Sequence, residues 1–167
     1  MKPTKPHESQ RGYFSWYLYD AMTVNPDIFV LTGDLGYKML DFIRDDFKDR
    51  FINCGASEQT MLDMAVGLAL SGKIPFVYSI TPFLLSRGHE TIRLYIDHEK
   101  IPVIICGSGR DDDYAIDGYS HDATDASLIL ESFPNIIEYW PSSKEGMPRI
   151  INEVIEKKVP AFISLAR

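Results

Sequence analysis

Short β-rich runs alternate with longer stretches of helical periodicity along the chain, and this alternation limits the fold more than any other feature. We predict six strands, at Ile28–Thr32, Phe51–Asn53, Phe76–Ser79, Val103–Cys106, Ile136–Tyr139 and Ala161–Leu165. Helices are predicted around and between them, at Tyr13–Met22, Met39–Phe47, Glu58–Ser71, Leu84–Asp97, Ala123–Leu130 and Gly146–Lys157. Such an alternation is typical of a parallel sheet covered by helices on both faces. We therefore expect an α/β fold, a three-layer α/β/α sandwich with a mainly parallel sheet of about six strands.

One domain accounts for the length and composition of the chain. Its 167 residues are 45% hydrophobic, which is enough to fill a single core. Residues 1–11 are polar, include two prolines and lack apolar spacing. We expect them to form a flexible N-terminal arm before a domain that spans residues 12–167. Cys54 and Cys106 fall in apolar, strand-like segments, where reduced core thiols are expected.

Charge and hydropathy argue against two classes of partner. A formal net charge of −7 disfavours general binding to nucleic acid phosphates. The chain shows no N-terminal apolar signal and no apolar run near the roughly 18 residues that span a bilayer. We therefore expect a cytoplasmic protein that binds neither nucleic acid nor membranes.

The third predicted helix places a carboxylate where parallel sheets bind ligands. Apolar residues recur at helical spacing from Met61 to Ala69, and Gly72 ends the run, so this helix begins near Ser57. Ligands of open parallel sheets bind beyond the carboxyl ends of the strands, which is where Glu58 stands. An acidic residue in a first helical turn is also favoured by the helix dipole and the free backbone amides. The pattern alone leaves both interpretations open.

The residues around this helix resemble a known family. The segment from Phe51 to Ile80 reads Phe-Ile-Asn-Cys-Gly-Ala-Ser-Glu-Gln and then Gly-Leu-Ala-Leu-Ser-Gly-Lys-Ile-Pro-Phe-Val-Tyr-Ser-Ile. It resembles the core of the pyrimidine-binding domain of the transketolase family, and is similar also to deoxyxylulose phosphate synthase and the pyruvate dehydrogenase beta chain. Asp-Gly-Tyr-Ser-His at 117–121 resembles the family's Asp-Gly-Pro-Thr-His, and 160–167 resembles its last strand. The resemblance covers about residues 12–167.

This resemblance implies that Glu58 acts on thiamine diphosphate. In the family, the matching glutamate bonds the N1′ ring nitrogen of the cofactor's aminopyrimidine. A carboxylate that shares a proton with this nitrogen favours the imino tautomer of the exocyclic amine, which then removes the proton from the thiazolium carbon. Phe83 lines up with an aromatic residue that packs on the pyrimidine, and a core phenylalanine is the competing interpretation.

Three other residues are implied near the cofactor and the substrate. Asp34 and Leu35 resemble the family's Ala-Asp-Leu, whose leucine supports the bent cofactor and whose aspartate lies near the reacting centre. A plain turn with an aspartate cap explains the same two residues. His121 matches a histidine that points at the substrate's oxygens, and it would otherwise be an exposed loop residue.

Arg87 and His89 follow a segment that departs from the family pattern. Ile80-Thr81-Pro82-Phe83 is longer than the family's Ser-Thr-Phe, so the register after it is open by about one residue. Each side chain therefore lines the cofactor pocket or the substrate channel, or is an ordinary helix-surface residue.

We expect no metal site on this chain. The run Asp111–Asp113 is typical of solvated acidic residues on a loop. The family holds its metal through Gly-Asp-Gly and a later Asn, which Gly33-Asp34-Leu35 does not match. The resemblance therefore implies a separate chain that carries the diphosphate-binding domain with Mg²⁺ or Ca²⁺, without which this chain is inactive. We expect a heterotetramer or another complex that contains a homodimer.

The leading hypothesis is a subunit of a split thiamine diphosphate-dependent transketolase. Glu58 would activate the cofactor and His121 would hold a sugar phosphate during two-carbon ketol transfer. One alternative is a subunit of a thiamine diphosphate-dependent 2-oxo acid decarboxylase or synthase, and another is a non-catalytic binding module derived from such an enzyme. An ordinary nucleotide-binding protein is disfavoured, because Gly107-Ser108-Gly109 lacks the third glycine and the helix of a dinucleotide motif.

Overall fold

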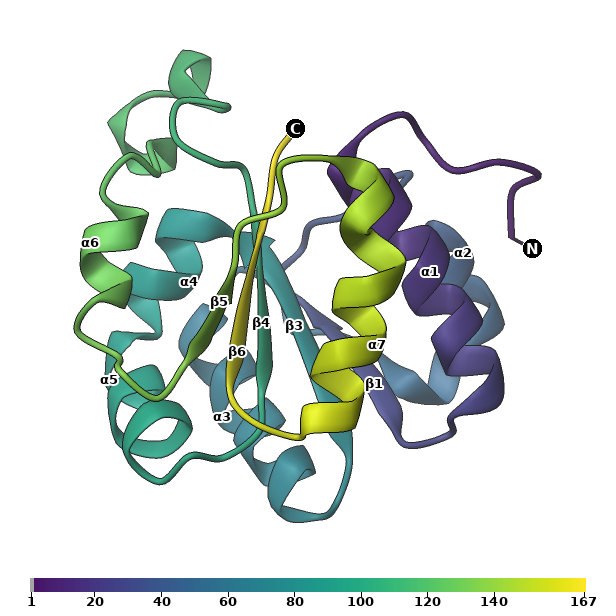
Figure 1. Ribbon diagram of the computed structural model, residues 1–167, viewed down its shortest axis with the longest axis horizontal. Helices are drawn as coiled ribbons and strands as arrows, with labels where there is room; N and C mark the ends of the chain where they lie inside the picture. Colours follow the sequence, from purple (N-terminus) through teal and green to yellow (C-terminus); the bar gives the residue numbers. More distant parts are fainter. Residues whose placement is uncertain (1) are drawn as a thin grey trace.

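A six-stranded sheet runs through the middle of the computed structural model, which describes residues 2–167 (Figure 1). The strands lie in the order β2-β1-β3-β4-β6-β5, and all five pairings are parallel. Their bounds are β1 Ile28–Thr32, β2 Phe51–Asn53, β3 Ile74–Ile80, β4 Ile104–Ser108, β5 Ile137–Tyr139 and β6 Ala161–Leu165. The predicted α/β class is confirmed, and the bounds of β1, β2 and β6 are the predicted ones.

Helices cover both faces of the sheet, as Figure 1 shows. One face carries α3 (Glu58–Leu70), α4 (Thr81–Arg87), α5 (His89–Thr91), the π-helical turn η2 (Ile92–His98) and α6 (Ala126–Leu130). The other carries α1 (Gln10–Val24), α2 (Asp41–Asp46) and α7 (Met147–Lys157). Four short 3₁₀ turns complete the chain: η1 (Lys48–Arg50), η3 (Ala115–Asp117), η4 (Tyr119–His121) and η5 (Lys144–Gly146).

Two hydrophobic clusters hold the three layers together. Alternate residues of each strand face opposite sides of the sheet, so Leu31 and Val77 join the cluster under α3 while Val30 and Phe76 join the cluster under α1. Burial on both faces explains why the central strands read as continuous apolar runs.

The first helix begins earlier than predicted. Ser9 caps α1, because its side chain accepts a hydrogen bond from the backbone N–H of Gly12. Gln10 is buried, donates to the carbonyl of Pro141 and accepts from the N–H of Ala166. The expected domain boundary at residue 12 therefore lies inside α1. Residues 9–11 escaped the sequence pattern because polar side chains, not apolar ones, anchor them.

The predicted helix Leu84–Asp97 is three consecutive segments. It begins at Thr81 and is interrupted at Gly88, where α4 passes into α5 and η2. A Cβ on Gly88 would collide with the side chain of Leu62, so the bare backbone allows this junction to pack closely on α3.

The strand order creates a switch point between β1 and β3. The chain leaves β1 for the edge strand β2 and leaves β3 in the opposite direction for β4. Consequently α2 and α4 lie on opposite faces, and a crevice opens at the carboxyl ends of these two central strands, which is where such sheets bind ligands. Within residues 2–167, no helix is both long and apolar enough to cross a membrane.

Candidate functional site

Glu58 lies at the switch point, at the first residue of α3. It is only 2% exposed, and each of its carboxylate oxygens has one hydrogen-bond donor. Oγ of Ser79, at the end of β3, donates to Oε1 over 3.2 Å. Nη1 of Arg87, at the end of α4, donates to Oε2 over 2.8 Å and forms an ion pair. These partners offset the large cost of removing a carboxylate from water.

The loop after β1 comes close to the same carboxylate. A Cβ added to Gly33 would lie 3.3 Å from Oε1 of Glu58 and 3.3 Å from Oγ of Ser79. This is tighter than ordinary van der Waals contact, so the loop backbone forms one wall of the Glu58 site. Gly33 and Ser79 are site residues that the sequence argument missed. The one available signal was a serine at the carboxyl end of an otherwise apolar strand.

Two rings extend the site outward from Arg87. The guanidinium carbon of Arg87 lies 3.9 Å from the ring centroid of Phe83, a cation–π contact. The ring of His121, in η4, meets Phe83 edge-on with 4.9 Å between the centroids. The structure therefore brings together four of the residues singled out in the sequence: Glu58, Phe83, Arg87 and His121.

A cleft of about 360 Å³ opens above these groups. Its walls come from α4, which supplies Phe83 and Arg87, and from the segment after η3, which supplies Ser120, Asp122 and Asp125. The side chain of Arg87 is 48% exposed to this cleft's surroundings, whereas that of Glu58 beneath it is 1% exposed. Arg87 thus stands between the buried carboxylate and the open cleft.

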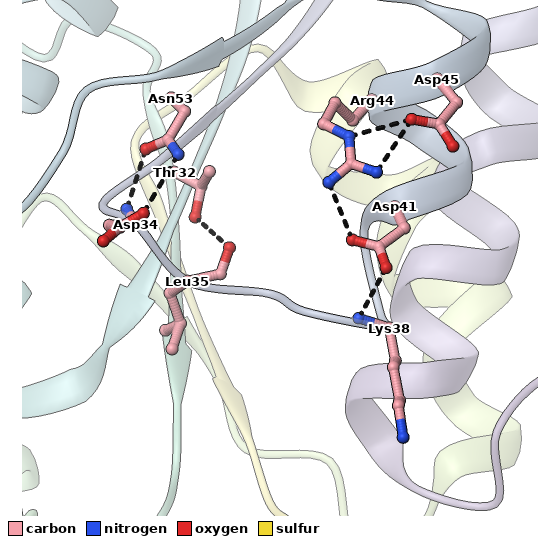
Figure 2. Close-up of polar contacts among 8 residues, drawn as sticks. All are labelled: Thr32, Asp34, Leu35, Lys38, Asp41, Arg44, Asp45 and Asn53. Carbon is pink, nitrogen blue, oxygen red and sulfur yellow. Dashed lines mark hydrogen bonds and ion pairs between the residues drawn. The ribbon is translucent and has the colours of Figure 1, made fainter.

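Asp34 and Leu35 lie beside this cluster in a neighbouring hollow of about 180 Å³ (Figure 2). Asp34 has a positive φ of 56°, and Asn53 supports it by accepting from its backbone N–H over 3.0 Å. The carbonyl of Leu35 accepts from the Thr32 hydroxyl, and its side chain packs against the cluster under α1. Figure 2 also shows the ion pairs of Arg44 that border this hollow.

His89 points to a different part of the molecule. Its side chain is exposed, and its ring lies 5.1 Å from that of Phe133, which follows α6. The structure therefore separates His89 from the cluster that contains Arg87, two residues earlier.

Arginine side chains gather on the other side of His121. Nη1 of Arg11 donates to the hydroxyl of Tyr114 over 2.6 Å, and the guanidinium groups of Arg11 and Arg167 lie 5.8 and 5.6 Å from the Tyr114 ring centroid. That ring is 6.4 Å from the ring of His121. Nε of Arg11 is buried without a hydrogen-bond partner among the described residues. A positive group with an unused donor therefore adjoins the histidine.

The acidic run Asp111–Asp113 organises its own loop. Asp113 accepts hydrogen bonds from the backbone N–H groups of Arg110 and Arg167, and Asp111 bridges to Ala123. Across residues 2–167, no group of three or more His, Cys, Asp or Glu side chains is placed to hold a metal ion.

Comparison with known proteins gives a consistent set of matches. The family model described as "transketolase, pyrimidine binding domain" matches residues 5–167. A putative transketolase C-terminal section from Methanocaldococcus jannaschii is 31% identical over 142 residues, which are 84% of this chain and 45% of that protein. One subunit of an apulose-4-phosphate transketolase from Actinobacillus succinogenes is 31% identical over 128 residues, 77% of this chain and 41% of that one. The chain therefore spans less than half the length of these curated relatives.

Solved structures show the same likeness. A split-gene transketolase, described as an inactive β4 tetramer, is 28% identical and superposes with a TM-score of 0.83 over 95% of this chain and 51% of its own. The transketolase of Leishmania mexicana has the same fold, with a TM-score of 0.85 at 18% identity, over 98% of this chain and 26% of its own.

Proposed function

The chain belongs to the family of transketolase pyrimidine-binding domains, and from this premise we propose that it is the pyrimidine-binding subunit of a split transketolase. The family implies dependence on thiamine diphosphate. In this proposal a separate chain carries the diphosphate-binding domain with Mg²⁺ or Ca²⁺. The pair transfers a two-carbon ketol unit, and neither the metal nor the diphosphate is held by this chain.

The buried carboxylate of Glu58 is the observation that carries the proposal. A carboxylate at the end of a central parallel strand, beside the face of Phe83, fits the pyrimidine half of the cofactor: an acceptor for a protonated ring nitrogen and an apolar surface for the ring. When bound, the cofactor supplies a carbon nucleophile. Glu58 holds a proton at the ring nitrogen, and burial beneath the cleft keeps water away from that bond.

The other residues keep the roles that their positions support. His121 lies between Phe83 and the arginine group, where it can donate to substrate oxygens. Asp34 and Leu35 flank the site from the loop after β1. We assign His89 no role, because its ring packs on Phe133.

Two findings support a need for a partner chain. This chain covers 45% of the Methanocaldococcus jannaschii relative, which is itself a section of a transketolase. The similar split-gene β chain is inactive as a tetramer of itself. We propose an assembly with two copies of each chain, in the cytoplasm, and fractionation of cells followed by mass measurement of the native complex tests both points.

The arginine group beside His121 favours a phosphorylated substrate. Arg11 and Arg167 converge on Tyr114, and the unused Nε donor of Arg11 suits an anionic oxygen. The Actinobacillus succinogenes relative is named for a sugar phosphate. We therefore propose sugar phosphates as donors. A 2-oxo acid is the second candidate, because its carboxylate would find the same positive charge.

The test is reconstitution with the partner chain, thiamine diphosphate and Mg²⁺. We expect turnover of a ketose phosphate only in the complete mixture, and a loss of at least about tenfold for Glu58→Ala, because proton transfer at the ring nitrogen loses its carboxylate. Glu156→Ala, which removes an exposed carboxylate from α7, is the matched control and should keep full activity.

Each other outcome has a definite meaning. Consumption of a 2-oxo acid in place of a ketose phosphate would identify the decarboxylase or synthase alternative. Full activity of Glu58→Ala would remove this carboxylate from the mechanism. A properly assembled pair that binds the cofactor and turns over neither substrate would identify a non-catalytic binding module.

A further inference from the structure

The two oxygens of Glu58 are not equivalent. Oε1 lies between the Ser79 hydroxyl and the backbone of Gly33, both of which belong to the central strands or the loop beside them. Ser79 is 1% exposed. Oε2 is bound by Arg87, whose side chain is about half exposed at the cleft. An incoming ligand can therefore reach Oε2 only, and must take it from Arg87.

Arg87 makes the contacts that an aminopyrimidine ring would make. Its guanidinium is planar, donates an N–H to Oε2 over 2.8 Å and lies over the Phe83 ring at 3.9 Å. A flat, protonated ring that donates to Glu58 and packs on Phe83 needs the same oxygen and the same face. The two groups cannot occupy this place together.

We propose that the pyrimidine binds by exchange: it displaces the Arg87 guanidinium from Oε2 of Glu58, while Ser79 acts as a positioning residue that retains Oε1. This inference rests on the proposed function. Arg87 shields the buried carboxylate until the ring arrives, and Ser79 keeps the carboxylate in one orientation during the exchange.

The cleft offers the displaced arginine another site. Asp122 and Asp125 line the same cleft as Arg87, and both carry carboxylates. One oxygen of Asp122, Oδ1, already accepts from the N–H and hydroxyl of Thr124, which holds this carboxylate in a defined orientation. Transfer of Arg87 from one carboxylate to another keeps its charge paired, so the exchange does not leave an isolated cation.

The first experiment measures binding of thiamine, without phosphates or metal, to the 167-residue chain by titration calorimetry. Because Arg87 competes for Oε2, we expect Arg87→Met to bind thiamine about fivefold more tightly than the natural chain. Methionine retains the length and apolar contact of the side chain without its charge. Arg93→Met, on the exposed side of η2, is the matched control and should bind like the natural chain. Arg87→Ala serves if the methionine variant does not fold.

The second experiment tests Ser79. We expect Ser79→Ala to bind thiamine about threefold more weakly, because Oε1 loses its donor and the carboxylate can rotate. Ser79→Ala should cause no additional loss in a Glu58→Ala background, which a general structural effect of the substitution would not explain. Ser164→Ala, at a buried serine of β6 that accepts from Arg110, is the control for removal of a buried hydroxyl.

A direct readout follows the guanidinium itself. The side-chain NMR signal of Arg87 should shift during a thiamine titration at the same concentration as the binding isotherm, whereas that of Arg93 should not. Equal or weaker thiamine binding by folded Arg87→Met and Arg87→Ala would overturn the exchange and make Arg87 a ligand of the cofactor. If Glu58→Ala binds thiamine as well as the natural chain, the proposed function itself fails, whatever Arg87 does.

Discussion

At the scale of single residues, the close approach of Gly33 to Glu58 leaves no room for a side chain. We expect Gly33→Ala to push on both Oε1 of Glu58 and Oγ of Ser79, since the new Cβ would lie 3.3 Å from each. Unfolding experiments in urea should show a loss of about 1 kcal/mol, and thiamine binding should weaken in parallel.

The matched control is Gly67→Ala in the middle of α3. A Cβ at this glycine meets nothing within 4 Å. Alanine should therefore raise the free energy of unfolding by up to about 1 kcal/mol through helix propensity alone. A Gly33→Ala chain as stable as the natural one, with unchanged thiamine binding, would mean that the loop yields freely.

The two cysteines differ in burial, which predicts their reactivity. Cys106 is fully buried in β4, and burial raises the pKa of its thiol well above the ordinary value of 9.0. Cys54, after β2, is half buried, and burial raises its pKa less strongly. At pH 8 we expect a thiol reagent to modify Cys54 alone in the folded chain and both cysteines in urea. Rapid labelling of Cys106 in the folded chain would contradict the buried β4.

The same burial gives stability a dependence on alkaline pH. Burial also raises the pKa of Tyr78 from 10.0 to about 12. Both groups are protonated in the fold and lose protons earlier in the unfolded chain, so their contribution is complete below about pH 9 and is lost as the pH rises through about 9 to 12. Cys106→Ala should flatten the first part of this decline in urea titrations at stepped pH, although the small cavity lowers the stability at every pH.

At the scale of elements, α1 depends on one hydroxyl. Ser9 accepts from the N–H of Gly12 over 3.1 Å and so satisfies a donor that the first helical turn leaves unpaired. We expect Ser9→Ala to lower the free energy of unfolding by about 1 kcal/mol, and Ser9→Thr or Ser9→Asp to retain most of it. Equal stability of the alanine and natural chains in urea would show that Gln10 alone fixes the start of α1.

At the scale of the whole molecule, the chain supplies half of a binding site. Its cleft has an acceptor and an aromatic face for a pyrimidine, and across residues 2–167 it groups no side chains that could hold a metal. We expect the chain by itself to bind thiamine and thiamine diphosphate with affinities within about threefold, because the phosphates add no metal-bridged contact.

Calorimetry with and without the partner chain and Mg²⁺ checks this expectation. Addition of both should strengthen binding of thiamine diphosphate far more than that of thiamine. A strong preference of the isolated chain for the diphosphate form would instead reveal an anion site on this chain, and the arginines around Tyr114 would be the first residues to substitute.

Local patterns in the sequence determined much of the fold. The alternation of strands and helices predicted the layered architecture, and three strands have the predicted bounds, because burial on both faces makes each central strand a continuous apolar run. The start of α1 was missed because it depends on the cap at Ser9 and on the contacts of Gln10 with distant residues.

Tertiary structure alone decided how the site is assembled. The resemblance singled out Glu58, but its partners Gly33, Ser79 and Arg87 meet it only because the sheet order places the ends of β1 and β3 side by side. The register after Pro82 was equally undecidable, since one residue along a helix turns a side chain by about 100°. The packing of α4 against β3 put Arg87 over Glu58, and the bend at Gly88 turned His89 toward Phe133, a choice made by contacts between residues far apart in the chain.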